Sequence, residues 1–525
     1  MVKVLVASVM PIVIGMFLSF AIEHLVEPHP KAFWRRPRAA LAIHLGIWIS
    51  IYSCAVLLLR RPWFAMCAVL TIQLIVVLVS DAKLHSLREP FVFQDFEYFV
   101  DTMKHPRLFL PFLGIWRGLL LVAVFCMVFF TGMVLEPSLA LGISFLDFVA
   151  GVFMLMFAGA VILRLGGLER PAVTFNPDAD IRSFGFWASL WCYAMAERSC
   201  PVVSTPFAEL KPTGMAIEQM PNLVVVQSES FFDPRRIYPM IRPEVLQTFD
   251  RLRASAGAYG KLTVPAWGAN TVRTEFSFLS GIDNEILGVH RFNPYRKVTE
   301  CSFLSLIGFV KGLGYRTVCV HPYPESYYGR SSVYPHLGFD EFIDIRSFVG
   351  SERFGAYVSD TAVAEKVCSL VEASAASAQP VFVFVITMEN HGPLHLEKVP
   401  TEEAACLYKE LPPPMCDDLA VYLRHLGNAD RMAEIISTRL LSLHRPSSLC
   451  WYGDHVPIMA KVYSALGEPD GTSDYLIWQT PGREAGNTRP AIRQDLPVQD
   501  LALALLNIAG LVATDVPLLQ TTLTH

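Results

Sequence analysis

The sequence predicts an N-terminal α-helical transmembrane domain followed by a C-terminal α/β domain, whose mostly parallel central sheet carries helices on both faces. Three observations predict this architecture. The 525-residue chain is 53% hydrophobic and only 17% charged, which is too apolar for an ordinary soluble protein. The apolar excess lies in the first third, in segments of about 20 residues that suit membrane-spanning helices. Beyond residue 221, short apolar runs of strand length alternate with helical periodicity.

The first third of the chain contains five apolar segments, at residues 4–25, 40–59, 63–80, 108–134 and 145–165. Each is long enough for a helix to cross about 30 Å of hydrocarbon. No small-residue cleavage site separates the first segment from the basic stretch at 34–38, so we expect an uncleaved span and not a signal peptide. These segments define a predicted transmembrane domain over residues 1–166.

The charges of the short loops predict an orientation for this domain. Basic residues gather after the first and third spans: Lys31, Arg35, Arg36, Arg38, Lys83, Arg88, Lys104 and Arg107. Such loops usually face the cytoplasm. With five spans, this charge bias by itself puts the C-terminal domain in the cytoplasm.

Residues 167–220 have mixed composition and read as a juxtamembrane connector, with an aromatic-rich run at 184–196 that we expect to lie on the membrane surface. Residues 221–525 form the predicted α/β domain. Strands are expected at 222–227, 315–320, 381–388, 448–452 and 475–479. Helices are expected at 244–254, 303–313, 361–374, 417–443 and 497–508. Near-continuous apolar strands between helices are typical of a parallel sheet covered on both faces.

Composition excludes or leaves open several further properties. A net charge of -5 and a pI near 6.3 give no basic field for a nucleic acid. Cys406 and Cys416 bracket a loop with three prolines. A disulfide there would suit an oxidising compartment, and two unrelated thiols have equal weight.

Polar residues follow three of the expected strands: Glu229 and Ser230, then Glu389 to Gly392, then Asp454 and His455. A single polar residue after a strand is more often a helix cap or a solvated turn. In parallel sheets, however, ligands bind outside the carboxyl ends of the strands. A glutamate, an aspartate and a histidine together suit a divalent ion such as Mn²⁺ or Zn²⁺, and less distinctively Mg²⁺.

Thr271 supplies a candidate nucleophile. It follows the small-residue segment 265–270 and precedes a helical pattern. By itself it reads as an N-cap. A hydroxyl at a helix N-terminus also lies where backbone N–H groups favour a phosphate, and a metal ion would promote its ionisation.

Three motifs occur in order: Glu229, then Thr271 after Asn270 and followed by Thr274–Glu275–Phe276, then Asp454–His455. This ordered set resembles the lipoteichoic acid synthase and phosphoglycerol transferase family, within the alkaline phosphatase and sulfatase superfamily. The resemblance implies an alkaline phosphatase/sulfatase-like fold, Thr271 as both nucleophile and metal ligand, and Glu229, Asp454 and His455 as the other metal ligands. It implies one divalent ion, Mn²⁺ first, with Mg²⁺ and Zn²⁺ as alternatives. The signature of sulfatases, Cys-x-Pro-x-Arg, is not found.

Four further residues match the family's substrate-binding positions: His321, Tyr328, Arg330 and His391. The better-known synthases have tryptophan at the position of Tyr328. Tyrosine keeps an aromatic wall there, and the exchange leaves the head-group preference open. Arg330 would clamp the phosphate through charge-assisted hydrogen bonds. The histidines would polarise the phosphate or carry a proton, and the sequence does not say which does which.

The resemblance implies that the head group of phosphatidylglycerol passes through a phosphothreonine to a glycan or polymer acceptor, with release of diacylglycerol. It also implies a multi-pass protein of the bacterial inner membrane whose catalytic domain faces the periplasm or exterior, against the charge bias of the loops. The alternatives are a phosphoethanolamine transferase with the same site and a non-catalytic lipid- or polymer-binding regulator.

Two features of the predicted spans bear on these alternatives. A transporter is disfavoured because the spans are expected to lack a charged, paired constellation. The charged segment 81–90, with Gln94 and Asp95, is expected to be an interfacial loop or a contact with the lipid donor or the catalytic domain.

Overall fold

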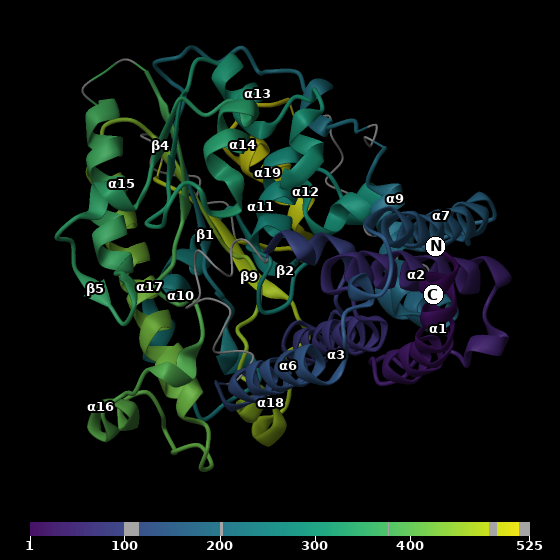
Figure 1. Cartoon of the computed structure of the whole chain (residues 1–525). Coiled ribbons are helices and arrows are strands. Elements are labelled where there is room, and N and C mark those ends of the chain that lie inside the picture. Colours follow the sequence, from purple (N-terminus) through teal and green to yellow (C-terminus); the bar gives the residue numbers. More distant parts are fainter. Residues whose placement is uncertain (99–114, 200–202, 376, 378, 482–490, 514–525) are drawn as a thin grey trace. The chain divides into compact units, whose positions relative to one another are not determined.

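The structure is a computed structural model that describes residues 1–98, 115–199, 203–375, 377, 379–481 and 491–513 (Figure 1). It divides into two compact units, Met1–Ser199 and Cys200–His525. The predicted connector at 167–220 is thus divided between them. Each unit is described by itself.

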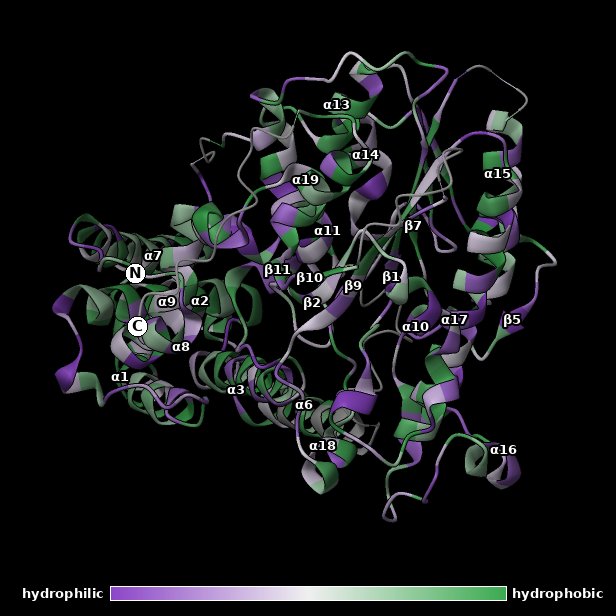
Figure 2. Ribbon diagram, turned by 180° about the vertical axis from the view of Figure 1, so that it is seen from behind, coloured by the Kyte–Doolittle hydropathy of each residue, from purple (hydrophilic) through white to green (hydrophobic). Residues whose placement is uncertain are grey.

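The first unit contains five helices long and apolar enough to cross a membrane, within the described residues. They are α1 (Val2–Glu23), α2 (Arg38–Leu59), α3 (Pro62–Leu87), α6 (Ile115–Leu135) and α7 (Phe145–Leu168). Their mostly hydrophobic colouring is visible in Figure 2. The five predicted spans are confirmed, except that residues 108–114 of the fourth lie outside the described residues, as do Lys104 and Arg107.

The helix α3 continues past the predicted end of the third span at residue 80 and ends at Leu87. The prediction of an interfacial loop over 81–90 is therefore wrong for residues 81–87. Lys83, on this last part of the helix, bonds through Nζ to Glu89 Oε1 (2.7 Å) and Asp95 Oδ2 (2.6 Å). Lys83 is therefore paired with carboxylates of its own unit, and lysine is itself a good helix former.

A buried ionic cluster joins α1, α2 and the segment between them. Glu23, at the end of α1, forms an ion pair with Arg36, and His44 Nδ1 on α2 lies 3.4 Å from Glu23 Oε1. All three side chains are buried. The expectation that the spans lack a charged, paired constellation is wrong, so it no longer counts against a transport function.

Two short helices end the first unit, α8 (Pro177–Phe184) and α9 (Phe186–Ala196). The predicted aromatic run forms α9, but its apolar side chains are buried within the unit. Phe186 and Leu190 pack with Val26 and Val77. These contacts show which side chains of α9 are covered within the unit, and the expected position on the membrane surface remains a prediction.

The second unit is built on a sheet with strand order β10-β2-β9-β8-β1-β7-β3-β4, to which β11 adds beside β2. The strands are β1 (Asn222–Ser228), β2 (Ala258–Thr263), β3 (Arg316–Val320), β4 (Glu341–Ile343), β7 (Val381–Ile386), β8 (Ser447–Gly453), β9 (Ser473–Gln479), β10 (Ile492–Arg493) and β11 (Leu496–Pro497). A separate hairpin pairs β5 (Arg353–Phe354) with β6 (Tyr357–Val358). All five predicted strands are found. The mostly parallel sheet is confirmed, with β9 antiparallel to both of its neighbours.

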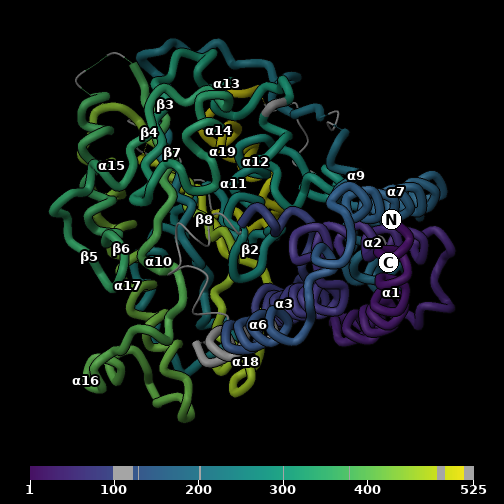
Figure 3. The backbone as a smooth tube through the Cα atoms, viewed as in Figure 1, coloured from purple at the N-terminus to yellow at the C-terminus, as the bar shows by residue number. Residues whose placement is uncertain are grey.

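Helices cover both faces of this sheet, as predicted (Figure 1). The helices of the second unit are α10 (Gln247–Ala254), α11 (Thr271–Ser280), α12 (Pro294–Lys297), α13 (Leu306–Gly312), α14 (Arg330–Leu337), α15 (Asp360–Ala375), α16 (Thr401–Ala405), α17 (Asp417–Ser442), α18 (Ala460–Leu466) and α19 (Val498–Ile508). Figure 3 traces the chain between them. The predicted helices at 244–254, 303–313, 361–374, 417–443 and 497–508 are found, with ends that differ by a few residues, as is usual for helix boundaries.

The strand β1 shows why both faces need cover. Val224 and Val226 pack in the core formed with α10, α15 and α17. Leu223 and Val225 point the other way, into the core formed with α11, α13, α14 and α19. Since successive side chains of a strand alternate between faces, a continuous apolar run requires helices on both sides.

Candidate metal centre and active site

Four neighbouring parallel strands end where the predicted site residues begin. Glu229 follows β1, and Asp454 follows β8, whose Gly453 is paired with Ser228. On the other side of β1, β7 leads to the segment that carries His391, and β3 leads to His321. The prediction that these strand ends meet at one edge of the sheet therefore agrees with the observed register.

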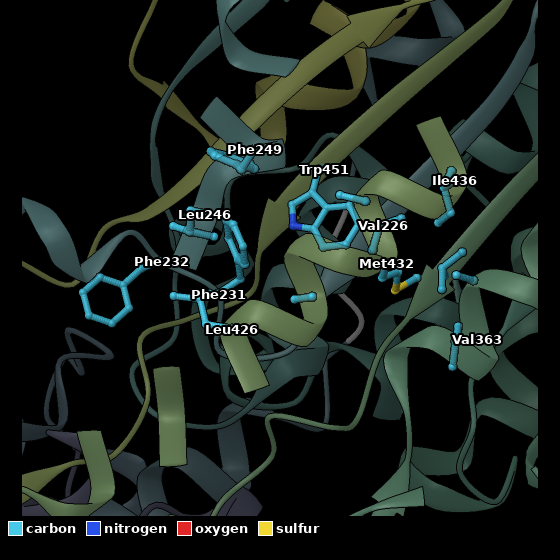
Figure 4. Close-up of a cluster of buried hydrophobic side chains, with 14 of the residues drawn as sticks. Val226, Phe231, Phe232, Leu246, Phe249, Val363, Leu426, Met432, Ile436 and Trp451 are labelled. Carbon is cyan, nitrogen blue, oxygen red and sulfur yellow. The ribbon is translucent and has the colours of Figure 1, made fainter. Parts of the chain in front are cut away.

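The segment after β1 is pinned by its neighbours in the core. Phe231 packs against Trp451 and Phe249, with ring centroids 5.9 and 5.0 Å apart (Figure 4). The Tyr422 hydroxyl donates to the carbonyl of Ser230 (2.9 Å). These contacts hold Ser230 in the left-handed region at φ +54°, a conformation costing about 1–2 kcal/mol for a residue with a side chain.

Gly453 brings the end of β8 against this segment. A Cβ at Gly453 would lie 1.8 Å from the carbonyl oxygen of Phe231. Only glycine therefore fits at this position. The close approach lets the Ser230 N–H donate to Asp454 Oδ1 at 2.8 Å.

Glu229, Asp454 and His455 form a group that can hold a metal ion, with ligand atoms within 4.8 Å of one another. All three are buried. His455 Nδ1 lies 3.1 Å from the Val456 carbonyl, which can only accept, so Nδ1 carries the proton. The lone pair of Nε2 is then left 3.4 Å from Asp454 Oδ2 and 3.7 Å from Glu229 Oε1.

This arrangement fits a cation. Asp454 Oδ2 and His455 Nε2 are buried without a hydrogen-bond partner. Two buried electron-rich atoms that face each other and a carboxylate without a donor of their own are unfavourable unless a positive charge lies between them. Burial, followed by the charge of Asp454, raises the pKa of Glu229 to about 8, and a bound cation would reverse that shift.

Thr271 is the first residue of α11, and the N-cap is Asn270 in the left-handed region at φ +65°. The reading of Thr271 as an N-cap is therefore wrong. One turn later, Thr274 Oγ1 donates to the Asp454 carbonyl (2.8 Å), and the Gly268 N–H donates to the Val456 carbonyl (3.1 Å). These bonds attach the start of α11 to the Asp454–Val456 segment. The roles of Thr271 as nucleophile and ligand remain predictions.

Arg330 and His321 are brought together, and both are 1% exposed. Arg330 Nη1 lies 3.3 Å from His321 Nε2, while the other edge of the guanidinium binds Glu275. The Tyr328 ring lies 5.3 Å from Arg330 Cζ, and Tyr328 is held at φ +56°. The guanidinium is already bound within the domain, and phosphate binding by these residues remains a prediction.

Sequence reasoning assigned no role to Glu275, which lies four residues after Thr271. That spacing puts both residues on the same face of a helix, and Glu275 also belongs to the Thr274–Glu275–Phe276 segment that contributes to the family resemblance. Neither signal could show that Arg330, Tyr295 and Tyr334 bind this carboxylate.

His391 lies on the segment after β7, and its Nδ1 donates to the Gly392 carbonyl (2.8 Å). Burial lowers the pKa of His391. Glu389 anchors this segment, because it accepts from the Asp360 N–H (2.7 Å) and lies 2.9 Å from His425 Nδ1. The sequence placed Glu389 at a strand end and gave no hint of these partners from two other helices.

Cys406 and Cys416 are both free thiols in the structure, the first exposed and the second buried. The disulfide that the sequence left open is not formed. These cysteines give no support for an oxidising compartment.

Comparison with known proteins assigns the family. Residues 221–511, more than half of the chain, match the model of the Sulfatase family. The chain belongs to the Sulfatase family. The inferred resemblance to the alkaline phosphatase and sulfatase superfamily is thereby confirmed, and members of that superfamily are phosphotransferases or hydrolases.

Two relatives of the chain come from Rhizobium meliloti. The chain is 27% identical over 500 residues to "Capsular polysaccharide biosynthesis protein RkpI", covering 92% of this chain and 89% of the relative. It is 26% identical over 262 residues to a "Putative cyclic beta-1,2-glucan modification protein", covering 50% of this chain and 39% of that relative.

A solved structure shares the fold of this Sulfatase family chain. Lipooligosaccharide phosphoethanolamine transferase A from Neisseria meningitidis, an integral membrane protein, aligns over 96% of each chain with a TM-score of 0.53 and 13% sequence identity. This likeness extends over the helical unit as well as the α/β unit. Its five helices that are long and apolar enough to cross a membrane indicate a multi-pass membrane protein, and its second unit is a sulfatase-like domain.

Proposed function

We propose that the protein is a metal-dependent phosphoglycerol transferase, which moves the head group of phosphatidylglycerol through Thr271 to a glycan or polymer acceptor. One observation carries the proposal. Asp454 Oδ2 and His455 Nε2 are buried without a partner and face Glu229. The start of α11, which carries Thr271, is hydrogen-bonded to the same segment.

The transfer would take place in two steps. The oxygen of Thr271 attacks phosphorus, the bond from phosphorus to the diacylglycerol oxygen breaks, and the threonine proton passes to that oxygen. An acceptor hydroxyl then attacks the phosphorus of the phosphothreonine, the bond from phosphorus to Thr271 Oγ1 breaks, and the acceptor's proton passes to that oxygen. Backbone N–H groups at the start of α11 are suited to hold the phosphate.

Glu229, Asp454, His455 and Thr271 would hold the divalent ion, for which we propose Mn²⁺, with Mg²⁺ or Zn²⁺ as alternatives. A mixed set of carboxylates, an imidazole and a hydroxyl suits these ions. When bound, the ion would neutralise the carboxylates and lower the pKa of the Thr271 hydroxyl.

Two kinds of support bear on the donor and the acceptor. A lipid donor suits a catalytic domain that belongs to a multi-pass membrane protein. A glycan acceptor suits the two relatives, which are named for capsular polysaccharide biosynthesis and for glucan modification. We further propose the bacterial inner membrane as the location, with the catalytic domain on the periplasmic or exterior side.

The test is release of diacylglycerol by the full-length protein in vesicles that contain labelled phosphatidylglycerol and Mn²⁺. We expect release, and a loss on the order of 10³-fold or more on Thr271→Ala substitution or chelation. Ser280→Ala is the matched control, because Ser280 lies on the same helix and its hydroxyl contacts only backbone in the described residues: it donates to the Phe276 carbonyl and accepts from the Ile282 N–H. No release from any phospholipid would favour a non-catalytic regulator that binds lipid or polymer.

A phosphoethanolamine transferase with the same site is the second candidate. The observation in its favour is the full-length match to a protein of that name. Mass spectrometry of the Thr271 peptide, after incubation with mixed phospholipids and no acceptor, separates the two. An adduct with the mass of phosphoglycerol supports the first candidate, and one with the mass of phosphoethanolamine supports the second.

A further inference from the structure

Glu275 is a fully buried carboxylate on which four hydrogen bonds converge. Arg330 donates from Nε (3.1 Å) and Nη2 (2.7 Å), and the hydroxyls of Tyr295 and Tyr334 donate to Oε1. Burial, followed by the charge of Glu275, raises the pKa of Tyr295 well above its usual value; burial and Glu275 do the same for Tyr334. Both phenols therefore remain protonated donors. A carboxylate so fully engaged has little capacity left for a metal ion or a proton.

The four residues come from three helices that the sequence separates. Glu275 lies on α11, one turn after Thr271, while Tyr295 lies on α12. Arg330 and Tyr334 are four residues apart on α14, so they share a face of that helix. Glu275 thus ties the helix of the candidate nucleophile to the segment that carries Arg330.

The binding of one edge of Arg330 fixes the direction of the other. With Nε and Nη2 on Glu275, Nη1 is left 3.3 Å from His321 Nε2. A guanidinium only donates, so Nε2 must accept. His321 Nδ1 lies 3.1 Å from the Ile386 carbonyl and must then carry the ring proton. Both nitrogens of His321 are thereby assigned.

We propose that Glu275 is a positioning residue for the proposed head-group transfer: it holds the Nε–Nη2 edge of Arg330, directs Nη1 at His321 and keeps His321 a neutral hydrogen-bond acceptor. This inference rests on the proposed function. It also assigns different roles to His321 and His391, which the sequence did not distinguish. His321 orients a polar group or Arg330 itself, and it neither gives nor takes a proton during the transfer.

The charged and titratable groups around His321 agree with this role. Arg330 faces it from α14, with Glu275 behind the guanidinium. Tyr323 lies beside the ring, at 6.1 Å between centroids, and His391 approaches from the segment after β7. Burial and the charge of Arg330 hold the pKa of His321 well below its usual value.

The first experiment uses a change that keeps every charge in place. Tyr334→Phe removes one donor to Glu275, and its matched control is Tyr315→Phe, which removes a buried hydroxyl bonded to the Pro221 carbonyl (2.8 Å). For diacylglycerol release by the full-length protein, we expect Tyr334→Phe to lower kcat by on the order of tenfold with a smaller change in KM. We expect the control to retain wild-type kcat.

The second experiment is a double-mutant cycle with Glu275→Gln and Arg330→Gln. If Glu275 acts only through Arg330, the double variant is no slower than the slower single variant. If the fold-losses in kcat of the two single variants multiply in the double variant, the proposal is overturned. Glu275→Gln alone leaves a buried charge unpaired and can fail to fold. In that case Tyr334→Phe and the double variant, which has no unpaired charge, carry the test.

The third readout is the pH dependence of kcat in His321→Gln. We expect a lower kcat with an unchanged pH profile, and loss of a limb of the profile would identify His321 as a proton carrier and overturn the proposal. The outcomes separate the two levels of inference. No release by the wild-type protein counts against the proposed function. Wild-type release that Tyr334→Phe leaves unchanged counts against Glu275 alone.

Discussion

At the scale of single residues, Ser230 organises the candidate metal centre from both of its polar groups. Its N–H binds Asp454 Oδ1 (2.8 Å), which leaves Oδ2 directed at the other ligands. Its hydroxyl donates to Glu229 Oε1 (3.1 Å). Residues that orient ligands in this way set metal affinity nearly as strongly as the ligands themselves.

We therefore predict that Ser230→Ala weakens Mn²⁺ binding by roughly 10- to 100-fold. The substitution removes the hydroxyl and keeps the left-handed backbone, whereas Ser230→Gly removes the hydroxyl and relieves the backbone strain. Titration calorimetry of the full-length protein measures the Mn²⁺ affinity of both variants, with Ser280→Ala as the control. Wild-type affinity in both variants would show that the hydroxyl has no part in binding.

At the scale of secondary-structure elements, the centre depends on how closely β8 approaches the segment after β1. The parallel register pairs Ser228 with Gly453. The missing side chain of Gly453 then lets Asp454 reach the N–H of Ser230. Neither strand makes this contact by itself, because it needs both ends at the same edge of the sheet.

Gly453→Ala tests this approach. Its Cβ would lie 1.8 Å from the Phe231 carbonyl oxygen, so we predict a loss of about 1–3 kcal/mol in the free energy of unfolding together with weaker metal binding. The matched control is Gly427→Ala inside α17, where a Cβ meets nothing within 4 Å. There we expect a gain of about 0.5–1 kcal/mol. Denaturant unfolding followed by tryptophan fluorescence measures both changes, and equal stability of the two variants would contradict the prediction.

At the scale of the whole molecule, loop charge and chemistry favour opposite orientations in the membrane. The basic residues after the first and third spans favour a cytoplasmic C-terminal domain. A transferase that builds on an external glycan needs the domain outside. Arg36 pairs with Glu23, and Lys83 pairs with Glu89 and Asp95. Acidic residues contribute little to this rule, so these pairs leave the opposition between loop charge and chemistry in place.

We predict that the C-terminus lies outside the cytoplasm. A phosphatase reporter that is active only in the periplasm, fused after His525, should be active. A fluorescent protein that matures only in the cytoplasm, fused at the same position, should remain dark. The reverse pair of results would contradict the topology and the access to an external acceptor.

The sequence by itself determined the membrane spans, the two-faced sheet and the meeting of Glu229, Asp454 and His455. Each depends on a local pattern: a run of about 20 apolar residues, a continuous apolar strand, or a polar residue directly after such a strand. Because parallel strands end at one edge, knowing the ends of β1 and β8 was sufficient to bring their next residues together.

Only the tertiary structure decided what supports that set. The four donors to Glu275, the approach of Gly453 to Phe231 and the charged cluster at Glu23 join residues far apart in the chain. The antiparallel direction of β9 is a similar case. These features follow from the packing of one element against another, which no local periodicity encodes. Arg330 shows the difference: the sequence suggested a residue for binding phosphate, and the fold shows its guanidinium bound to Glu275 and His321.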